Sequence, residues 1–292
     1  MSSHSAWRAV ADFWPRADTS QFVRAANIDF HVQVSGSGDD VLLLHGAGAS
    51  AHSFAGLASL LSEHYRVIAP DLPGQGFTNL LPLDDVGLAP FAHYLVELMA
   101  ALSATPRWII GHSAGAALAA QYALTAPSRP AGVLCINAAF NPFGSLAAPL
   151  FSKTAKWFAR SRWLPKALAS PTLRWRATGS MLADTGSSID PVMSRCYDRL
   201  LSNPDHIAGT LRMMAGWDLP SLLAQLPTLH STVWLAGAEG DRTIPPERST
   251  SVSRDLPLSR SVRIPGLGHL AHEENPDIFA RLFHEMVATT AE

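Results

Sequence analysis

The stretch "WIIGHSAGAALAAQYAL", residues 108–124, joins a short apolar run to an alanine-rich run through the turn Gly111-His112-Ser113-Ala114-Gly115. The first run predicts a buried strand and the second a helix. The turn matches the G-x-S-x-G pattern, in which a serine occupies a sharp bend between strand and helix. Small residues two before and two after that serine let the neighbouring backbone pack closely, and the helix dipole favours negative charge beside it. The pattern alone is common, but its flanks favour a nucleophilic Ser113 over an ordinary buried strand and helix.

The composition is that of a globular chain: 292 residues, 47% hydrophobic and 16% charged, with a formal net charge of -2. This length fits one large domain, or a core with an inserted lobe. The net charge argues against a nucleic-acid partner, because nucleic-acid-binding domains are usually strongly basic. The two cysteines, Cys135 and Cys196, lie in apolar or helix-like contexts. A chain of this size needs no disulfide, so a reducing cytoplasm is the simpler interpretation.

The sequence also predicts whether the protein has a transmembrane segment or a signal peptide. No apolar run approaches the ~18–20 residues that span a bilayer. The first twenty residues contain no apolar core followed by a small-residue cleavage site, so we predict no signal peptide. We expect a soluble, cytoplasmic protein without a transmembrane segment. A weak peripheral membrane contact stays open at this point.

Strands and helices alternate over most of the chain. Residues 28–34 alternate apolar and polar side chains, which predicts a half-exposed antiparallel strand. The runs that follow are apolar on both faces, as in a parallel sheet covered by helices. These runs are residues 41–44, 67–69, 108–110, 133–136, 233–236 and 262–264. Helices are predicted at 53–62, 90–103 and 114–124. The fold class is therefore α/β, with functional loops at the carboxyl edge of the sheet.

The alternation stops between about residues 141 and 226, where tryptophans and methionines lie in segments that read as helices. We predict a helical lid over 141–226, inserted into a core made of 1–140 and 227–292. Residues 153–176 hold seven basic side chains and no acid: Lys153, Lys156, Arg160, Arg162, Lys166, Arg174 and Arg176. The favoured interpretation is a solvated basic face with tryptophans in the core. The alternative is a surface for an anionic ligand, an acidic partner or a lipid headgroup.

A serine hydroxyl needs a base to remove its proton. The chain contains 12 histidines, and His269 is the first candidate because it follows the last apolar run in the glycine-containing stretch "IPGLGHLAHEENP". His272, three residues later, is the second choice. His45 and His112 flank active-site loops and are expected to shape them. The remaining candidates weighed are interpreted as ordinary surface residues: His64, His206 and His284.

The base in turn needs an acid that fixes its tautomer. Asp241 follows an apolar run in "TVWLAGAEGDRTIPP", and Glu239 is a less favoured substitute. The chain order is then Ser113, Asp241, His269. This is the serine–acid–histidine order of one hydrolase architecture and differs from both major serine protease folds.

Two backbone amides are expected to bind the oxyanion of a tetrahedral intermediate. The stretch "LLLHGAGAS" places Ala47 directly after a predicted central strand, and Ala114 follows the serine. Losing one comparable donor typically costs ~3–4 kcal/mol of transition-state stabilisation. Five further residues are predicted to line the substrate pocket: His45, Gly46, His112, Asn137 and Trp217.

The motifs "HGAGAS", "DLPGQGFT", "GHSAGAA", "GAEGD" and "GLGHLAHEENP" together resemble the α/β-hydrolase superfamily along nearly the whole chain. Less generic stretches are similar to the magnesium-chelatase accessory family of bacteriochlorophyll biosynthesis. They are "WPRADTSQFVRA", "DLPGQGFT" with Gln75 where many relatives have histidine, "DTGSSID" and "MMAGWDLPSL". The second resemblance implies a role beside magnesium chelatase, with a tetrapyrrole or an ester as the small-molecule ligand.

Two hypotheses of different class follow. The first is a serine hydrolase that cleaves an ester or related acyl bond, either within this pathway or as a general carboxylesterase. Serine at the turn argues against dehalogenase or epoxide hydrolase chemistry, for which related folds place aspartate there. The second is a non-catalytic tetrapyrrole-binding protein. No cofactor is predicted, and the sequence shows neither a carboxylate cluster for a metal nor a P-loop, which excludes the chelatase motor itself.

Overall fold

A computed structural model describes residues 3–140, 160–161 and 163–290. Its centre is one eight-stranded sheet, with the strands in the order β1-β2-β4-β3-β5-β6-β7-β8. The strands are β1 (Ser20–Ala25), β2 (Ile28–Ser35), β3 (Asp40–Leu44), β4 (Arg66–Pro70), β5 (Trp108–His112), β6 (Gly132–Ile136), β7 (Thr232–Ala238) and β8 (Ser259–Ile264). The α/β fold predicted from the strand–helix alternation is confirmed.

Six of these strands, β3 to β8, pair in parallel, whereas β1 and β2 are antiparallel to their neighbours. Parallel neighbours need crossover connections, and those crossovers place helices on both faces of the sheet. The helices of the core are α2 (Ala55–Leu61), α3 (Leu88–Ala101), α4 (Ala114–Thr125), α11 (Pro246–Ser249), α12 (Ala271–Glu274) and α13 (Pro276–Thr290). All parallel strands therefore end at one edge of the sheet, where the loops carrying the predicted site residues follow.

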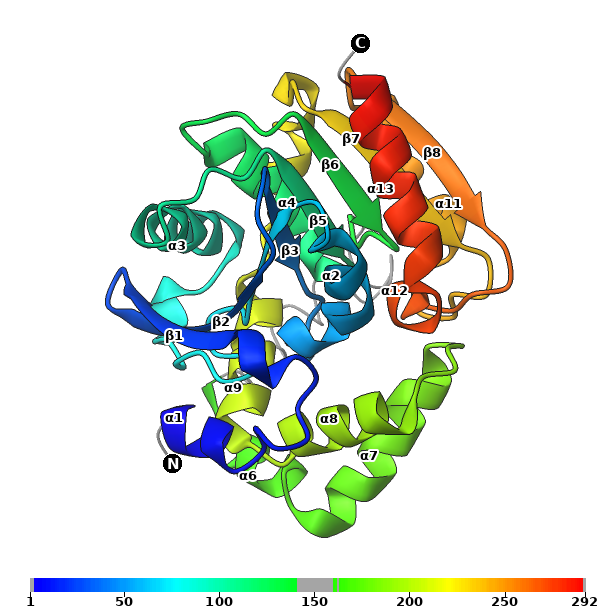
Figure 1. Cartoon of the computed structure of the whole chain (residues 1–292). Helices are drawn as coiled ribbons and strands as arrows, with labels where there is room; N and C mark the ends of the chain where they lie inside the picture. The colour runs from blue at the N-terminus through cyan, green and yellow to red at the C-terminus, as the bar shows by residue number, and fades with distance from the viewer. Residues whose placement is uncertain (1–2, 141–159, 162, 291–292) are drawn as a thin grey trace.

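Successive side chains of the central strands pack against opposite helix layers. In β3, Leu42 and Leu44 lie in the cluster with helices α3 and α4, whereas Val41 and Leu43 lie in the cluster with α2 and α13. Figure 1 shows α3 and α4 on one side of the sheet and α2 and α13 on the other. This two-sided burial is the reason why the central strands are continuous apolar runs instead of alternating ones.

The two ends of the sheet differ from the sequence-based expectation. The antiparallel direction of β2 is confirmed, but its predicted exposed face is wrong, because His31 and Gln33 are buried. A segment before the sheet covers this face, with Trp7 against His31 and Pro15 against Gln33. The apolar-on-both-faces expectation is wrong for β8, an edge strand with mostly exposed side chains. Strand β1, which pairs with β2 through a hairpin, was not predicted.

Helices also occupy the interval between β6 and β7, where the helical lid was predicted. They are α6 (Leu164–Leu168), α7 (Pro171–Asp184), α8 (Pro191–Leu201), α9 (Pro204–Gly216) and α10 (Leu219–Leu223). Figure 1 shows α6 to α9 grouped beyond one end of the sheet, beside the N-terminal helix α1 (Ser3–Arg8). Three of the seven predicted basic residues, Lys153, Lys156 and Arg162, lie outside the described residues. Trp163 is 80% exposed, so the interpretation of the lid tryptophans as core residues is wrong at that position.

The N-terminal segment joins the lid to the sheet. Val10 and Trp14 pack with Phe77 and with Cys196 and Leu200 of α8 in one apolar cluster. Cys196 and Cys135 are both buried free thiols, and burial raises the pKa of each to about 12. Both cysteines are therefore inert packing residues at neutral pH.

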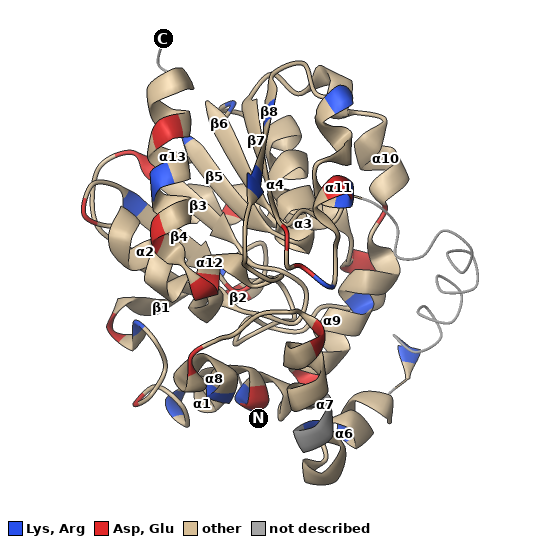
Figure 2. Ribbon diagram, turned by 90° about the vertical axis from the view of Figure 1, so that its right-hand side faces the viewer, with Lys and Arg blue, Asp and Glu red and all other residues tan. Residues whose placement is uncertain are grey.

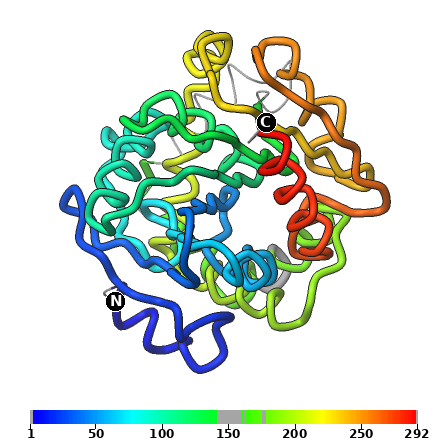
Figure 3. Tube along the Cα trace, turned by 45° about the horizontal axis from the view of Figure 1, so that its top comes forward, coloured from blue at the N-terminus to red at the C-terminus, as the bar shows by residue number. Residues whose placement is uncertain are grey.

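The outer surface carries mixed charge. Figure 2 shows acidic and basic residues interspersed along the ribbon of α13, and the tube in Figure 3 shows the N-terminal helix α1 well apart from the end of α13. Across the described part of the chain, every helix is too short or too polar to cross a bilayer.

Candidate active site

Ser113 occupies a strained turn between β5 and α4. Its backbone has φ 53 and ψ -118, a conformation that non-glycine residues rarely adopt and that costs roughly 1–3 kcal/mol. The flanking glycines make the turn possible, because a Cβ on Gly111 would lie 2.4 Å from the carbonyl oxygen of Gly115. A Cβ on Gly115 would lie 2.1 Å from the carbonyl oxygen of Leu44. The Ser113 amide donates to the carbonyl of Ile136 at 2.9 Å, which ties the turn to β6.

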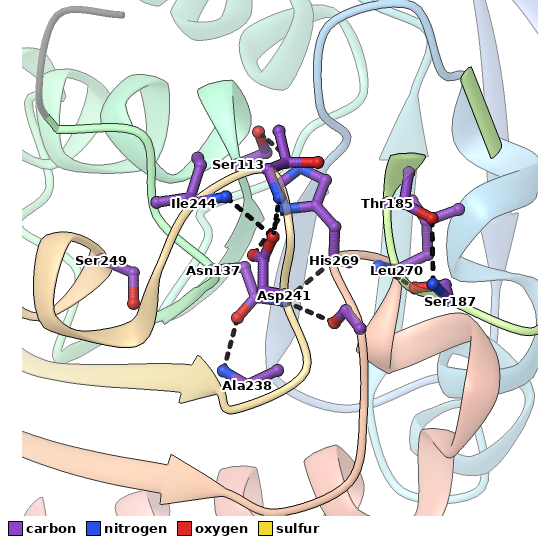
Figure 4. A network of polar contacts seen from close by, with 12 residues as sticks. Ser113, Asn137, Thr185, Ser187, Ala238, Asp241, Ile244, Ser249, His269 and Leu270 are labelled. Carbon is purple, nitrogen blue, oxygen red and sulfur yellow. Dashed lines mark hydrogen bonds and ion pairs between the residues drawn. The ribbon is translucent and has the colours of Figure 1, made fainter. Parts of the chain in front are cut away.

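The side chains of Ser113, His269 and Asp241 meet at the carboxyl edge of the sheet (Figure 4). Nε2 of His269 lies 3.1 Å from Oγ of Ser113, and Nδ1 of His269 lies 2.7 Å from Oδ2 of Asp241. All three residues are buried. An ionised carboxylate only accepts hydrogen bonds, so this arrangement places the imidazole proton on Nδ1 and leaves Nε2 free to accept the serine proton.

The loop after β7 holds the other oxygen of Asp241 in place. Oδ1 accepts hydrogen bonds from the backbone amides of Thr243 at 2.7 Å and Ile244 at 2.8 Å. These two hydrogen bonds fix the plane of the carboxylate. Glu239, the substitute weighed from the sequence, is exposed on the same loop. The structure therefore brings Asp241, and not Glu239, to the histidine.

A short stretch of the lid holds the loop of His269. The amide of His269 donates to the carbonyl of Thr185 at 3.0 Å, and Oγ of Ser187 accepts from the amide of Leu270 at 2.8 Å. A Cβ on Gly268 would lie 2.4 Å from the carbonyl carbon of Gly186, so the two segments touch. Sequence reasoning missed Thr185 and Ser187 as site residues, although "DTGSSID" had stood out as a distinctive stretch.

Two residues predicted to line the pocket instead support the histidine loop. Asn137 is fully buried, and its Nδ2 donates to the carbonyls of Gly268 at 3.1 Å and His269 at 2.9 Å. Its Oδ1 accepts from the amide of Ala238 at 2.7 Å. His112 donates from Nε2 to the same His269 carbonyl at 2.8 Å. Burial and the neighbouring histidines hold the pKa of His112 well below its usual range, so it stays neutral.

The predicted oxyanion donors, Ala47 and Ala114, belong to two different segments of the core. Ala114 is the first residue of α4, so its amide has no partner within the helix. Ala47 is exposed in the loop after β3. Gly46 lies directly beside the serine, because a Cβ on Gly46 would lie 3.1 Å from Cβ of Ser113. The loop thus approaches the serine at a position that favours glycine.

The other two residues predicted for the pocket have partners in the protein. His45 is buried, donates from Nδ1 to the carbonyl of Gly46 at 2.8 Å and accepts at Nε2 from the amide of Leu72 at 2.9 Å. It therefore joins the loop after β3 to the loop after β4. Trp217 is half-buried and packs edge-on against Phe91 of α3, with ring centroids 6.0 Å apart.

The remaining histidines separate into buried and exposed ones. His272, the second candidate base, is buried and its Nε2 lies 2.8 Å from Oγ of Ser53. Burial lowers the pKa of His272 to about 3. His64 and His284 are exposed as expected. The interpretation of His206 as a surface residue is wrong: it is 1% exposed, and α9 places it against the loops after β3 and β4.

In the described ranges, no three His, Cys, Asp or Glu side chains form a group that would hold a metal ion.

The family model described as "Alpha/beta hydrolase family" matches residues 41–282. The chain belongs to the alpha/beta hydrolase family. Within that family it is 39% identical over 272 residues to the magnesium-chelatase 30 kDa subunit of Rhodobacter capsulatus, covering 92% of this chain and 95% of the relative. The resemblance to the magnesium-chelatase accessory family is thereby confirmed.

Two further similarities are more distant. A 2-hydroxy-6-oxo-6-phenylhexa-2,4-dienoate hydrolase of Burkholderia cepacia is 24% identical over 286 residues, covering 92% of this chain and 96% of the relative. The structure of a thermophilic esterase from Thermogutta terrifontis superposes with a TM-score of 0.71 at 21% identity, covering 93% of this chain and 98% of the esterase. The esterase structure shows the shared fold.

Proposed function

We propose that this alpha/beta hydrolase is a serine hydrolase that cleaves an ester or related acyl bond through Ser113. Two contacts carry the proposal. Oγ of Ser113 lies 3.1 Å from Nε2 of His269, and Nδ1 of His269 lies 2.7 Å from Oδ2 of Asp241. A serine, a base and an orienting acid within hydrogen-bond reach of one another are the parts that nucleophilic acyl transfer needs.

The proposed reaction has two halves. His269 takes the proton of Ser113 as Oγ attacks the substrate carbonyl carbon, and the backbone amides of Ala47 and Ala114 bind the resulting oxyanion. His269 then gives that proton to the leaving alcohol as the ester bond breaks, which leaves an acylated Ser113. A water molecule, deprotonated by His269, releases the acid and restores the serine. Asp241 stabilises the imidazolium in both halves and keeps the proton on Nδ1.

The biological setting that we propose lies beside magnesium chelation in bacteriochlorophyll biosynthesis, in the cytoplasm. The similarity to a protein named magnesium-chelatase 30 kDa subunit supports magnesium chelatase as a partner and a tetrapyrrole or its ester as the small-molecule ligand. The same similarity is the reason to keep tetrapyrrole binding without catalysis as a second candidate. A general carboxylesterase outside the pathway is the third.

Covalent labelling tests the catalytic proposal. A fluorophosphonate probe should label the wild-type protein and should not label Ser113→Ala, while Ser259→Ala, which removes an exposed serine, should label like the wild type. A short-chain nitrophenyl ester should be hydrolysed by the same two proteins that label. A folded wild type that neither labels nor hydrolyses the ester would overturn the serine hydrolase and favour the binding role.

Fluorescence tests the ligand separately. Protoporphyrin and its magnesium derivative should quench tryptophan emission in a saturable way at micromolar concentration. Ser113→Ala should bind like the wild type, because the hydroxyl is not proposed to recognise the ring. Quenching that does not saturate would count against a tetrapyrrole ligand whatever the labelling shows.

The lid also supports a proposal of weak contact with anionic membranes. Trp163 is 80% exposed beside the exposed Arg160 and Lys166. Tryptophan and basic residues together favour the headgroup region of an anionic bilayer. The protein should co-sediment with phosphatidylserine vesicles at low salt, and Lys166→Glu should weaken this. Absence of sedimentation at low salt would remove the idea.

A further inference from the structure

We propose that His206 and Gln75 are positioning residues that hold the oxyanion loop, residues 46–49. Through these two residues, lid helix α9 fixes the position of one part of the active site. The inference rests on the proposed serine hydrolase and adds to it a function for the lid. It assigns a specific task to a histidine and a glutamine outside the series of contacts from Ser113 to Asp241.

His206 connects α9 to two loops of the core. It is 1% exposed, its Nε2 lies 3.2 Å from the carbonyl oxygen of Gly48, and its Nδ1 lies 2.9 Å from the amide nitrogen of Gly76. A carbonyl only accepts and an amide only donates, so both contacts are made by the neutral ring with its proton on Nε2. Burial lowers the pKa of His206 to about 4, in keeping with this state.

Gln75 holds the other backbone group of the same residue. Its side chain is fully buried, and Oε1 accepts from the amide of Gly48 at 2.7 Å. Its Nε2 lies 2.9 Å from the sulfur of Met213, and the hydroxyl of Thr210 lies 3.5 Å from Oε1. Met213 and Thr210 both belong to α9. His206, which belongs to α9, therefore binds the carbonyl of Gly48, and Gln75, which contacts α9, binds its amide.

Gly48 follows Ala47, whose amide is the proposed oxyanion donor. Gly48 has φ +80, in the left-handed region that favours glycine. Because glycine has no side chain, other groups must restrain the turn at this position. The turn is closed by the amide of Ala49 donating to the carbonyl of Gly46 at 3.2 Å. The Gly48 amide belongs to the Ala47–Gly48 peptide, which adjoins the peptide that carries the Ala47 amide, and the Gly48 carbonyl belongs to the peptide that follows. Holding both of these peptides restrains the direction of the Ala47 amide, and that direction is what an oxyanion donor requires.

Helix α9 packs closely against the loop after β4. A Cβ on Gly209 would lie 1.9 Å from the carbonyl oxygen of Gly74, so the helix sits directly on the backbone of the loop that carries Gln75. Figure 1 shows α9 close to the strand ends, between the sheet and helices α6 to α8. Any shift of α9 therefore moves His206 and the support of Gln75 at the same time.

The test compares variants that keep a contact with variants that remove it. Gln75→Glu keeps an oxygen that can accept from Gly48, whereas Gln75→Leu does not. His206→Gln keeps a donor for the Gly48 carbonyl, whereas His206→Leu does not. Each protein is assayed for kcat and KM on nitrophenyl acetate, for the rate of fluorophosphonate labelling and for unfolding in urea.

Positioning predicts that kcat falls about 10- to 100-fold in each leucine variant with little change in KM, and less in the contact-keeping variants. Ser231→Ala is the matched control, because it removes a buried hydrogen bond to Pro130 before the start of β7. That variant should lose stability and keep kcat. If a leucine variant does not fold, the contact-keeping variant of the same residue gives the comparison.

Two results would overturn the inference, and they are distinguishable. An active wild type whose leucine variants lose only stability, as Ser231→Ala does, makes His206 and Gln75 structural residues and leaves the serine hydrolase intact. A folded wild type that neither labels nor hydrolyses the ester overturns both the proposed function and this extension of it.

Discussion

The side-chain nitrogen of Asn137 donates to the backbone carbonyl of His269 at 2.9 Å, and Asn137 itself adopts the left-handed φ of 47. One residue at the end of β6 thus connects the loop of the proposed base to the amide of Ala238 at the end of β7. The loop after Ala238 carries Asp241. The relative position of the proposed base and acid therefore depends on a residue that is neither.

Asn137→Gly should accordingly impair both stability and reactivity. Glycine keeps the left-handed backbone but leaves the buried amide of Ala238 and the carbonyl of Gly268 without their side-chain partner. We expect the free energy of unfolding to fall by roughly 2–4 kcal/mol and labelling of Ser113 to slow at least about 10-fold. Asn27→Gly is the matched control, since Asn27 also has a positive φ but lies exposed in the β1–β2 turn. Equal behaviour of the two variants would contradict the connecting role.

Asp241→Asn should separate orientation from packing. Asparagine keeps an oxygen for the amides of Thr243 and Ile244, so the fold should be retained. Its amide nitrogen would instead donate to Nδ1 of His269, which places the imidazole proton on Nε2 and leaves the serine without a base. Ester hydrolysis should fall by about 10⁴-fold, as for the same change in serine proteases. Glu239→Gln on the same loop should change little, and a comparable loss there would reverse the assignment of the acid.

Gly115→Ala should destabilise the protein strongly. Its Cβ would lie 2.1 Å from the carbonyl oxygen of Leu44, and backbone on both sides cannot yield without disrupting the turn that presents Ser113. We expect a loss of more than about 3 kcal/mol in urea unfolding, or no folded protein. Gly179→Ala in α7 is the opposite case, because nothing lies within 4 Å of that Cβ. It should gain roughly 0.5–1 kcal/mol from helix propensity. A tolerated Gly115→Ala would mean that the turn is looser than described.

The contact between lid and core at Glu273 predicts a pH dependence. Glu273 accepts from the hydroxyls of Tyr197 on α8 and Ser53, both at 2.5 Å, and burial raises its pKa to about 7. The folded protein then keeps a proton that the unfolded chain releases near pH 4.5. The stability that comes from this proton is present below pH 4.5 and is lost as the pH rises to about 7.

Glu273→Gln isolates this effect, because glutamine does not titrate. Relative to the variant, the wild type should lose up to about 3 kcal/mol of unfolding free energy between pH 4.5 and 7. The exposed Glu63→Gln serves as the control, and its difference from the wild type should not vary in this way. A difference for Glu273→Gln that is flat across this range would show that the carboxyl is ionised throughout.

The sequence by itself determined the fold class and the positions where chemistry was expected. The run at 108–124 carries a strand, a turn and a helix in adjacent residues, so local preferences were sufficient to predict β5, Ser113 and α4. The strands of the parallel sheet were visible because burial on both faces leaves an apolar run. Asp241 and His269 were chosen because each follows such a run, and parallel strands end at one edge of the sheet.

Only the tertiary structure decided which side chains hold those residues in place. His206 lies in a helix with no local pattern that distinguishes it from a surface histidine, and its contact with Gly76 spans 130 residues. The burial of His31 and Gln33 in β2 and the exposure of Trp163 likewise depend on which other segments pack against these residues. The alternation of apolar and polar residues along the chain does not encode that packing. Asn137 was expected at the pocket, and its side-chain amide connects two distant segments, because it binds backbone groups of the His269 loop and of Ala238 at the end of β7. Contacts between distant segments depend on the folded topology, so residues defined by such contacts carry little signal in the sequence.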